Sequence, residues 1–131
     1  MLGYITLGTN DLDASRAYYD ALLGEIGAKR LMVMEENGFT MYGVEFGQPA
    51  LCVTKPYDGN PATVGNGMMA AIIVDDRAKV DQLYAKAMEL GSQDEGGPGV
   101  RGEEGDQAFY AAYFRDPDGN KLCAFKVGPA G

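Results

Sequence analysis

The feature that most constrains the fold of this chain is an internal repeat with a spacing of 65 residues. Asp11 and Asp76 each follow a short apolar segment, and Tyr19 and Tyr84 come eight residues after them, in amphipathic segments. The spacing is close to half of the 131 residues, which is enough chain for one domain or two small joined modules. The repeat therefore predicts a single α+β domain, built from two modules that each contain one strand, one helix and three further strands.

The first module is expected to occupy residues 1–58. An alternating strand comes first, and Asp11 is the side chain expected to cap the helix that follows, because its carboxylate can accept a hydrogen bond from the first turn. The helix is expected to end at Gly24 or Gly27. Turn sequences then separate three short strands. The expected strands of this module are Leu2–Gly8, Ala28–Glu35, Phe39–Phe46 and Ala50–Lys55.

A segment rich in Gly, Pro and Asn, at about residues 56–67, is the predicted linker, and the second module is expected at 68–131. It begins with an apolar strand at Met68–Val74, followed by a helix at 77–90 that is capped by Asp75-Asp76 and stopped by Gly91. The next segment, Ser92–Gly105, has to supply the second strand in spite of its glycines. We therefore expect that strand at an edge of its sheet.

The second module closes with a predicted β-hairpin. Its turn is Asp116-Pro117-Asp118-Gly119, in which proline presets the first corner and glycine takes the left-handed position. A loop of this length pairs Arg115 with Lys121 and Tyr113 with Cys123. One face of the hairpin then carries Ala111, Tyr113, Arg115, Cys123 and Phe125.

The net charge and the hydropathy of the chain limit the classes of molecule that it is expected to bind. The formal net charge is −8, which argues against binding to nucleic acid or to anionic membranes and permits a cationic ligand. The longest apolar run, Met68–Val74, is far shorter than the ~20 residues of a membrane span. The N-terminus has no basic region of the kind that opens a signal peptide. A cytoplasmic protein is therefore expected.

The chain contains no histidine and only two cysteines. Without histidine, Ser-His-Asp and Cys-His catalytic pairs are excluded, and so is the commonest transition-metal ligand. The cysteines, Cys52 and Cys123, are far apart in a chain with no sign of secretion, so we expect no disulfide between them.

The opening YITLGTNDLDASRAYYDALL, the internal repeat and the closing YAAYFRDPDGNKLCAF together resemble the vicinal oxygen chelate superfamily. This group includes glyoxalase I, bleomycin-resistance proteins, fosfomycin-resistance enzymes and extradiol dioxygenases. The resemblance implies two tandem βαβββ modules, whose paired sheets enclose a cleft, and a homodimer. Because one fold serves many chemistries, the resemblance alone does not define the function.

Enzymes of the superfamily hold a metal ion with His and Glu side chains on the first and last strand of each module. The resemblance places Tyr4, Cys52, Met69 and Cys123 at these positions. A phenol, two thiols and a thioether are poor ligands for the divalent ions that these enzymes use, so we expect no metal and no other cofactor. Copper(I) is the alternative for such a soft set, and plain core packing is the interpretation we favour over it.

The leading prediction is metal-independent binding of a small, partly aromatic molecule in an apolar cleft, as in sequestration or drug resistance, with no catalytic residue. The predicted ligand-binding residues are Tyr4, Cys52, Met69, Arg101, Tyr113, Arg115, Cys123 and Phe125.

The two arginines are included because a guanidinium group binds anions well. Arg101 is expected in a loop at the mouth of the cleft. For Arg115, an ion pair with Asp116 or Asp118 is the alternative to ligand binding.

Three other functions stay open at this stage. One is a metal-dependent lyase or dioxygenase of the same superfamily, such as a lactoylglutathione lyase-like enzyme. Another is a redox-sensitive thiol at Cys123, although apolar neighbours raise the pKa of a thiol and lower its reactivity. The third is a cleft that is filled by side chains and binds nothing.

Overall fold

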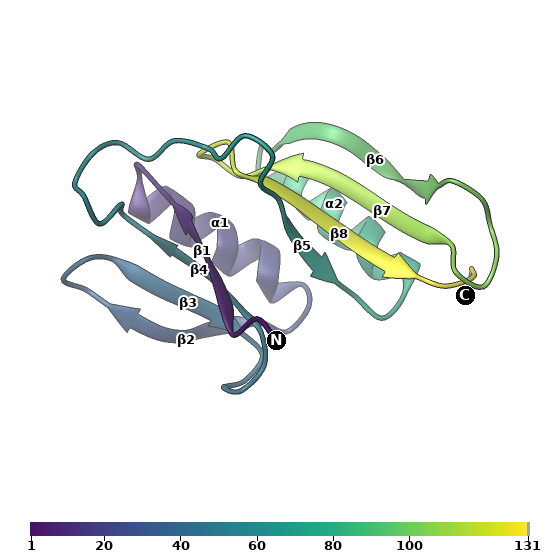
Figure 1. Cartoon of the computed structure of the whole chain (residues 1–131), viewed down its shortest axis with the longest axis horizontal. Coiled ribbons are helices and arrows are strands. Elements are labelled where there is room, and N and C mark those ends of the chain that lie inside the picture. The colour runs from purple at the N-terminus through teal and green to yellow at the C-terminus, as the bar shows by residue number, and fades with distance from the viewer. Residues whose placement is uncertain (131) are drawn as a thin grey trace.

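A computed structural model describes residues 1–130 of the chain, which fold into two four-stranded sheets with one helix on each (Figure 1). We call the sheet of strand order β1-β4-β3-β2 sheet A and the sheet of order β5-β8-β7-β6 sheet B. The α+β class and the two βαβββ modules predicted from the repeat are confirmed. Gly131, with which the predicted second module ends, lies outside the described residues.

The first module contains β1 (Tyr4–Gly8), α1 (Leu12–Gly24), β2 (Lys29–Met34), β3 (Phe39–Gly43) and β4 (Ala50–Thr54). The Asp11 carboxylate caps α1 by accepting a hydrogen bond from the backbone N–H of Ala14, as predicted. Strand β3 ends three residues earlier than predicted, because the chain turns there and the N–H of Gln48 bonds to the carbonyl oxygen of Glu45.

The second module contains β5 (Ala70–Ile73), α2 (Arg77–Glu89), β6 (Gln93–Arg101), β7 (Phe109–Arg115) and β8 (Lys121–Val127). Asp76 caps α2 through the N–H of Lys79, and Gly91 has the left-handed conformation expected of a C-terminal glycine. The glycine-rich segment does form the edge strand, β6. Arg101 is the last residue of β6, so its predicted position in a loop is wrong.

The strand register confirms the repeat and shows where the two copies differ. Thr6 pairs with Cys52 between the parallel strands β1 and β4, and Ala71 pairs with Cys123 between β5 and β8. Thr6 and Ala71 are 65 residues apart, as are the two helices, whereas Cys52 and Cys123 are 71 apart. The second module therefore has six additional residues between α2 and β8, and part of this extra length is in β6, which has nine residues where β2 has six.

Each helix packs on one face of its own sheet, and the two helices also contact each other. The rings of Tyr19 and Tyr42 lie 5.9 Å apart in the first module, and those of Tyr84 and Phe114 lie 6.5 Å apart in the second. Figure 1 shows both helices on the same side of the molecule, behind the sheets. We call the face of each sheet opposite its helix the open face. No helix within residues 1–130 is long and apolar enough to cross a membrane.

The Asp116 carboxylate joins the two modules at the turn of the hairpin. It accepts hydrogen bonds from the Tyr19 hydroxyl (2.6 Å), the side-chain amide of Asn120 (2.9 Å) and the backbone N–H groups of Asp118 and Asn120 (2.9 and 2.8 Å). The same Asn120 amide donates to the carbonyl oxygen of Gly8 in β1 (3.0 Å). We call this network the Asp116 clamp. It makes the predicted turn a link between α1, β1 and the second module.

Candidate small-molecule binding site

The structure divides the predicted site residues between the open faces of the two sheets. Strand alternation and register place Tyr4 and Cys52 on the open face of sheet A, and Tyr113, Arg115, Cys123 and Phe125 on that of sheet B. Met69 immediately precedes β5, and Arg101 ends β6 beside β7. The hairpin register is as predicted, with Tyr113 opposite Cys123 and Arg115 opposite Lys121.

On sheet A, aromatic rings cover the strand that carries Cys52. The rings of Tyr4 on β1 and Phe39 on β3 meet edge to face at 6.0 Å, and β4 runs between these two strands. Cys52 has no exposed surface, and burial raises the pKa of its thiol to about 11. The thiol is therefore protonated at neutral pH and shielded from solvent.

On sheet B, Cys123 is also completely buried. Burial raises the pKa of its thiol, and the nearby cations Arg101 and Lys121 oppose this shift. Both cations lie over the ring of Tyr113: the guanidinium carbon of Arg101 is 5.3 Å and the Nζ atom of Lys121 is 5.5 Å from the ring centroid. The open face of sheet B thus combines an aromatic ring with two positive charges.

Apolar surface continues beside this ring, where Phe109 and Phe125 stack at 5.4 Å. Arg115 is held differently from Arg101, because its Nε atom bonds to Glu95 at 3.0 Å and its Nη1 atom bonds to the carbonyl oxygen of Gly119. The alternative of an ion pair with Asp116 or Asp118 is therefore wrong. The carboxylate partner comes from β6, which was predicted only as a glycine-rich edge strand.

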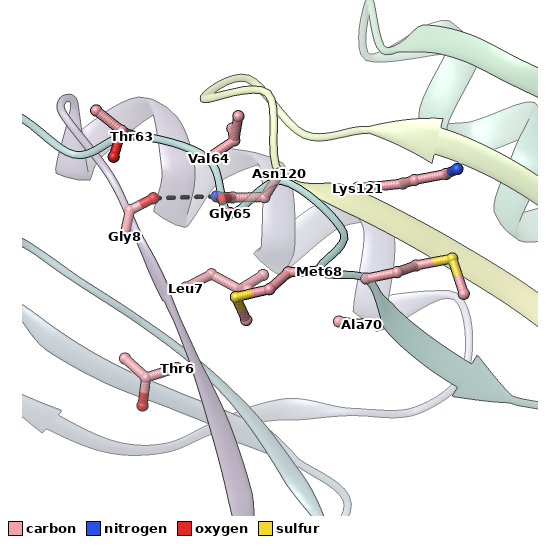
Figure 2. Close-up of a pocket in the computed structure, with 11 residues that line it drawn as sticks. Thr6, Leu7, Gly8, Thr63, Val64, Gly65, Met68, Ala70, Asn120 and Lys121 are labelled. Atoms are coloured by element: carbon pink, nitrogen blue, oxygen red, sulfur yellow. Dashed lines mark hydrogen bonds between the residues drawn. The ribbon is translucent and has the colours of Figure 1, made fainter.

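The junction between the sheets contains a pocket of about 130 Å³, which Figure 2 shows in close-up. It is lined by residues 6–8 of β1, residues 63–65 of the linker, residues 68–70, Asn120 in the turn of the hairpin and Lys121, the first residue of β8. Met69 is the member of the predicted set that lies there. In the same view, the side chain of Met68 extends toward β1 and that of Lys121 extends away from it.

A second pocket, of about 210 Å³, lies on the open face of sheet A against the turn between β3 and β4. Tyr4, Leu31 and Met41 line it, together with residues 45–48 of the turn. Each of these two pockets thus contains one of the eight predicted residues, and a common cleft for all eight stays a prediction. Lys121 was missed by sequence reasoning, although the predicted hairpin register already placed it opposite Arg115.

The sequence profile of the Glyoxalase/Bleomycin resistance protein/Dioxygenase superfamily matches residues 1–124. The chain belongs to this superfamily. A glyoxalase/bleomycin resistance protein from Albidiferax ferrireducens T118 has a similar structure, with a TM-score of 0.81, 33% identity and coverage of 96% of this chain and 98% of that one. A search of curated proteins found no match to the chain.

Two more distant members of the superfamily fold extend this comparison. A hypothetical protein from S. aureus is 26% identical, with a TM-score of 0.69 and coverage of 97% of this chain and 93% of that one. A lactoylglutathione lyase from Agrobacterium tumefaciens is 21% identical, with a TM-score of 0.66 and coverage of 96% and 92%. At this level of identity, the likeness to the lyase extends to the fold alone.

The residues that the resemblance places at the superfamily's metal positions are poor ligands for a divalent ion. The two thiols, Cys52 and Cys123, lie on different sheets, are buried and have raised pKa values. A thiol has to lose its proton to bind a metal, which these surroundings oppose. Within residues 1–130, no three His, Cys, Asp or Glu side chains form a group that could hold a metal ion.

Proposed function

We propose that this glyoxalase/bleomycin resistance-like protein binds a small organic molecule on the open faces of its sheets without a metal ion, in the manner of a sequestration or resistance protein. The observation that carries the proposal is the chemistry of the residues that the resemblance places at the family's metal positions. On sheet A, the rings of Tyr4 and Phe39 pack over the strand that carries the buried Cys52 thiol. Aromatic and apolar groups at the positions that the resemblance assigns to metal ligands favour an organic ligand over a metal ion.

Exposed apolar side chains on the open faces support binding of an organic ligand. Tyr4 is 54% exposed and Met34 is 48% exposed on sheet A, and Ile73 is 70% exposed on sheet B. Exposed apolar side chains on a sheet face without a helix are available to an organic ligand or to a second protein surface. The two pockets, of about 130 and 210 Å³, are smaller than the roughly 300–1,000 Å³ of a typical ligand site. We therefore include a second copy of the chain, which completes the cavity in a homodimer.

The test of the proposal is to purify the protein without chelator and to measure its metal content and its native mass together. We expect well under one metal ion per chain, and a native mass that exceeds the polypeptide mass by that of an organic molecule. A divalent metal at one equivalent per site, together with a catalytic activity that a chelator abolishes, would reject the proposal in favour of a metal-dependent lyase or dioxygenase.

The oligomeric state is tested separately by light scattering across a range of protein concentrations. The expected species is a dimer, and Ile73→Glu should shift it toward monomer, because a buried carboxylate at an interface is costly. Leu90→Glu is the matched control, since Leu90 is an exposed apolar residue at the end of α2, away from the open faces. A monomer at all concentrations would contradict the proposed completion of the cavity.

A further inference from the structure

Arg101 differs from the other arginines of the chain in having no carboxylate partner. Arg16, Arg30, Arg77 and Arg115 each lie within 4.0 Å of an Asp or Glu oxygen. Among residues 1–130, no such contact is formed by Arg101, although the chain has 19 acidic and only 11 basic side chains. A guanidinium group left without a counter-ion in so acidic a protein is available to an anion from outside.

The glycines of β6 provide the space in which this guanidinium lies. A Cβ atom added to Gly96 would lie 3.2 Å from Nη2 of Arg101 and 3.3 Å from the ring of Tyr113, and one added to Gly99 would lie 3.1 Å from Nη1. Glycine weakens the interior of a strand, and β6 is irregular here. The missing side chains at Gly96 and Gly99 leave space in which the guanidinium group lies over the ring of Tyr113.

The guanidinium is also fixed in orientation, which makes it a preorganised donor. Nη1 of Arg101 donates to the carbonyl oxygen of Gly99 at 2.9 Å, and Nη2 donates to that of Gly97 at 2.7 Å. These bonds use two of the five N–H groups of a guanidinium and leave the others free. A group held in this way loses little freedom when a ligand binds.

Lys121 supplies a second unpaired cation next to the same ring. Its Nζ atom is 5.5 Å from the centroid of Tyr113, and no carboxylate among residues 1–130 lies within 4.0 Å of it. Arg115, which precedes the turn on the same face, is instead neutralised by Glu95. The positive charge on this face is thus concentrated at Arg101 and Lys121, against the net charge of −8 of the whole chain.

We propose that Arg101, Lys121 and Tyr113 form a binding site for the carboxylate group of a small planar organic acid on the open face of sheet B. The carboxylate accepts charge-assisted hydrogen bonds from Arg101 and Lys121. The planar part of the acid lies against Tyr113 and the neighbouring Phe109–Phe125 stack. The inference rests on the proposed small-molecule binding function and narrows it to an anionic ligand, although the overall charge alone would favour a cation.

The test uses benzoate and its neutral analogue benzamide, titrated separately into ¹⁵N-labelled full-length protein and followed by NMR. Benzoate should shift the backbone signals of Arg101, Tyr113 and Lys121, and benzamide should bind at least about tenfold more weakly, because it lacks the charge. Equal affinities, no shifts with benzoate, or shifts confined to sheet A would each overturn the inference.

Substitutions then separate the role of the guanidinium from general charge effects. Arg101→Gln should weaken benzoate binding about tenfold, and Gly99→Ala should weaken it several-fold without a change of charge, because the new methyl group meets Nη1. Lys121→Gln should also weaken binding, whereas Lys126→Gln should change it less than about twofold. Lys126 is the matched control because it lies on β8 opposite Tyr110, on the face that packs toward α2.

These results are independent of the native mass measurement that tests the proposed function. A co-purified neutral or cationic molecule, with no preference for benzoate over benzamide, would leave the proposed function standing and overturn the inference of an anion site. Unchanged benzoate affinity in both Arg101→Gln and Gly99→Ala would overturn it as well.

Discussion

Replacement of Tyr19 by phenylalanine removes one hydrogen bond of the Asp116 clamp and leaves the ring in place. The Tyr19 hydroxyl donates to the Asp116 carboxylate at 2.6 Å, and both groups are buried. The same carboxylate oxygen keeps one partner in the variant, the side-chain amide of Asn120. Because a hydrogen bond to a charged group contributes about 1.5–3 kcal/mol, we expect Tyr19→Phe to lower the free energy of unfolding by that amount.

The assay is chemical denaturation at pH 7, with Tyr110→Phe as the matched control. Tyr110 also donates to an aspartate, Asp81, at 2.7 Å, but this bond is exposed to solvent. An exposed interaction with a charge contributes less than about 1 kcal/mol. The control variant should therefore lose less free energy of unfolding than Tyr19→Phe. If Tyr19→Phe lowered the free energy of unfolding no more than Tyr110→Phe, the buried hydrogen bond of the clamp would contribute no more to stability than an exposed one.

The pH dependence of the stability that Tyr19→Phe loses provides a second measurement. Burial raises the pKa of Asp116, and the hydrogen bond from Tyr19 opposes this shift. With a raised native pKa, the group favours folding below its unfolded pKa of about 3.9, and this contribution is lost as the pH rises through the native pKa. Loss of the hydroxyl raises the native pKa further, so Tyr19→Phe should cost more at pH 7 than near pH 4. An equal cost at both values would contradict this assignment.

Two further predictions concern the thiols and the glycines. At pH 8 a thiol with a pKa of about 11, such as that of Cys52, is roughly 0.1% ionised, and burial also raises the pKa of Cys123. Because both thiols are buried, neither should react with a thiol reagent within minutes in the native protein, whereas both should react in denaturant. Rapid reaction in the native protein would contradict the burial of these thiols. Gly119→Ala should destabilise the protein by about 1–2 kcal/mol, because Gly119 has φ +90 and an added Cβ would lie 3.2 Å from Val64. Gly24→Ala in α1 should instead stabilise the protein by about 0.4–1 kcal/mol, because alanine lowers the conformational entropy of the unfolded chain. Thermal denaturation of both variants measures this contrast, and equal effects would refute it.

Sequence reasoning succeeded where the determinants are local. The caps at Asp11 and Asp76 and the turn that ends at Gly119 depend on residues within a few positions of each other, and all three are as predicted. The hairpin register follows from the turn, which is why Tyr113 and Cys123 were paired correctly. The spacing of the repeat then extended these local predictions to the whole fold.

Contacts between residues far apart in the sequence could not be predicted in this way. Tyr19 and Asp116 are 97 residues apart, and nothing near Asp116 in the sequence indicates a tyrosine hydroxyl as its partner. Likewise, the bulges of β6 set the register that brings Glu95 to Arg115 and lays Arg101 across Tyr113. The frequency of glycine in this segment was visible in the sequence, but its meaning depends on which side chain occupies the space that the glycines leave.

The Asp116 clamp also bears on how the protein unfolds. The repeat suggests two units that could fold separately, yet the first would leave the Tyr19 hydroxyl without an acceptor and the second would leave the Asp116 carboxylate short of a donor. The 71-residue offset places Glu45 at the corresponding site of the first module, and it is exposed, so the link exists once and is not duplicated with the repeat. We therefore expect the two similar halves to unfold together, as one cooperative unit.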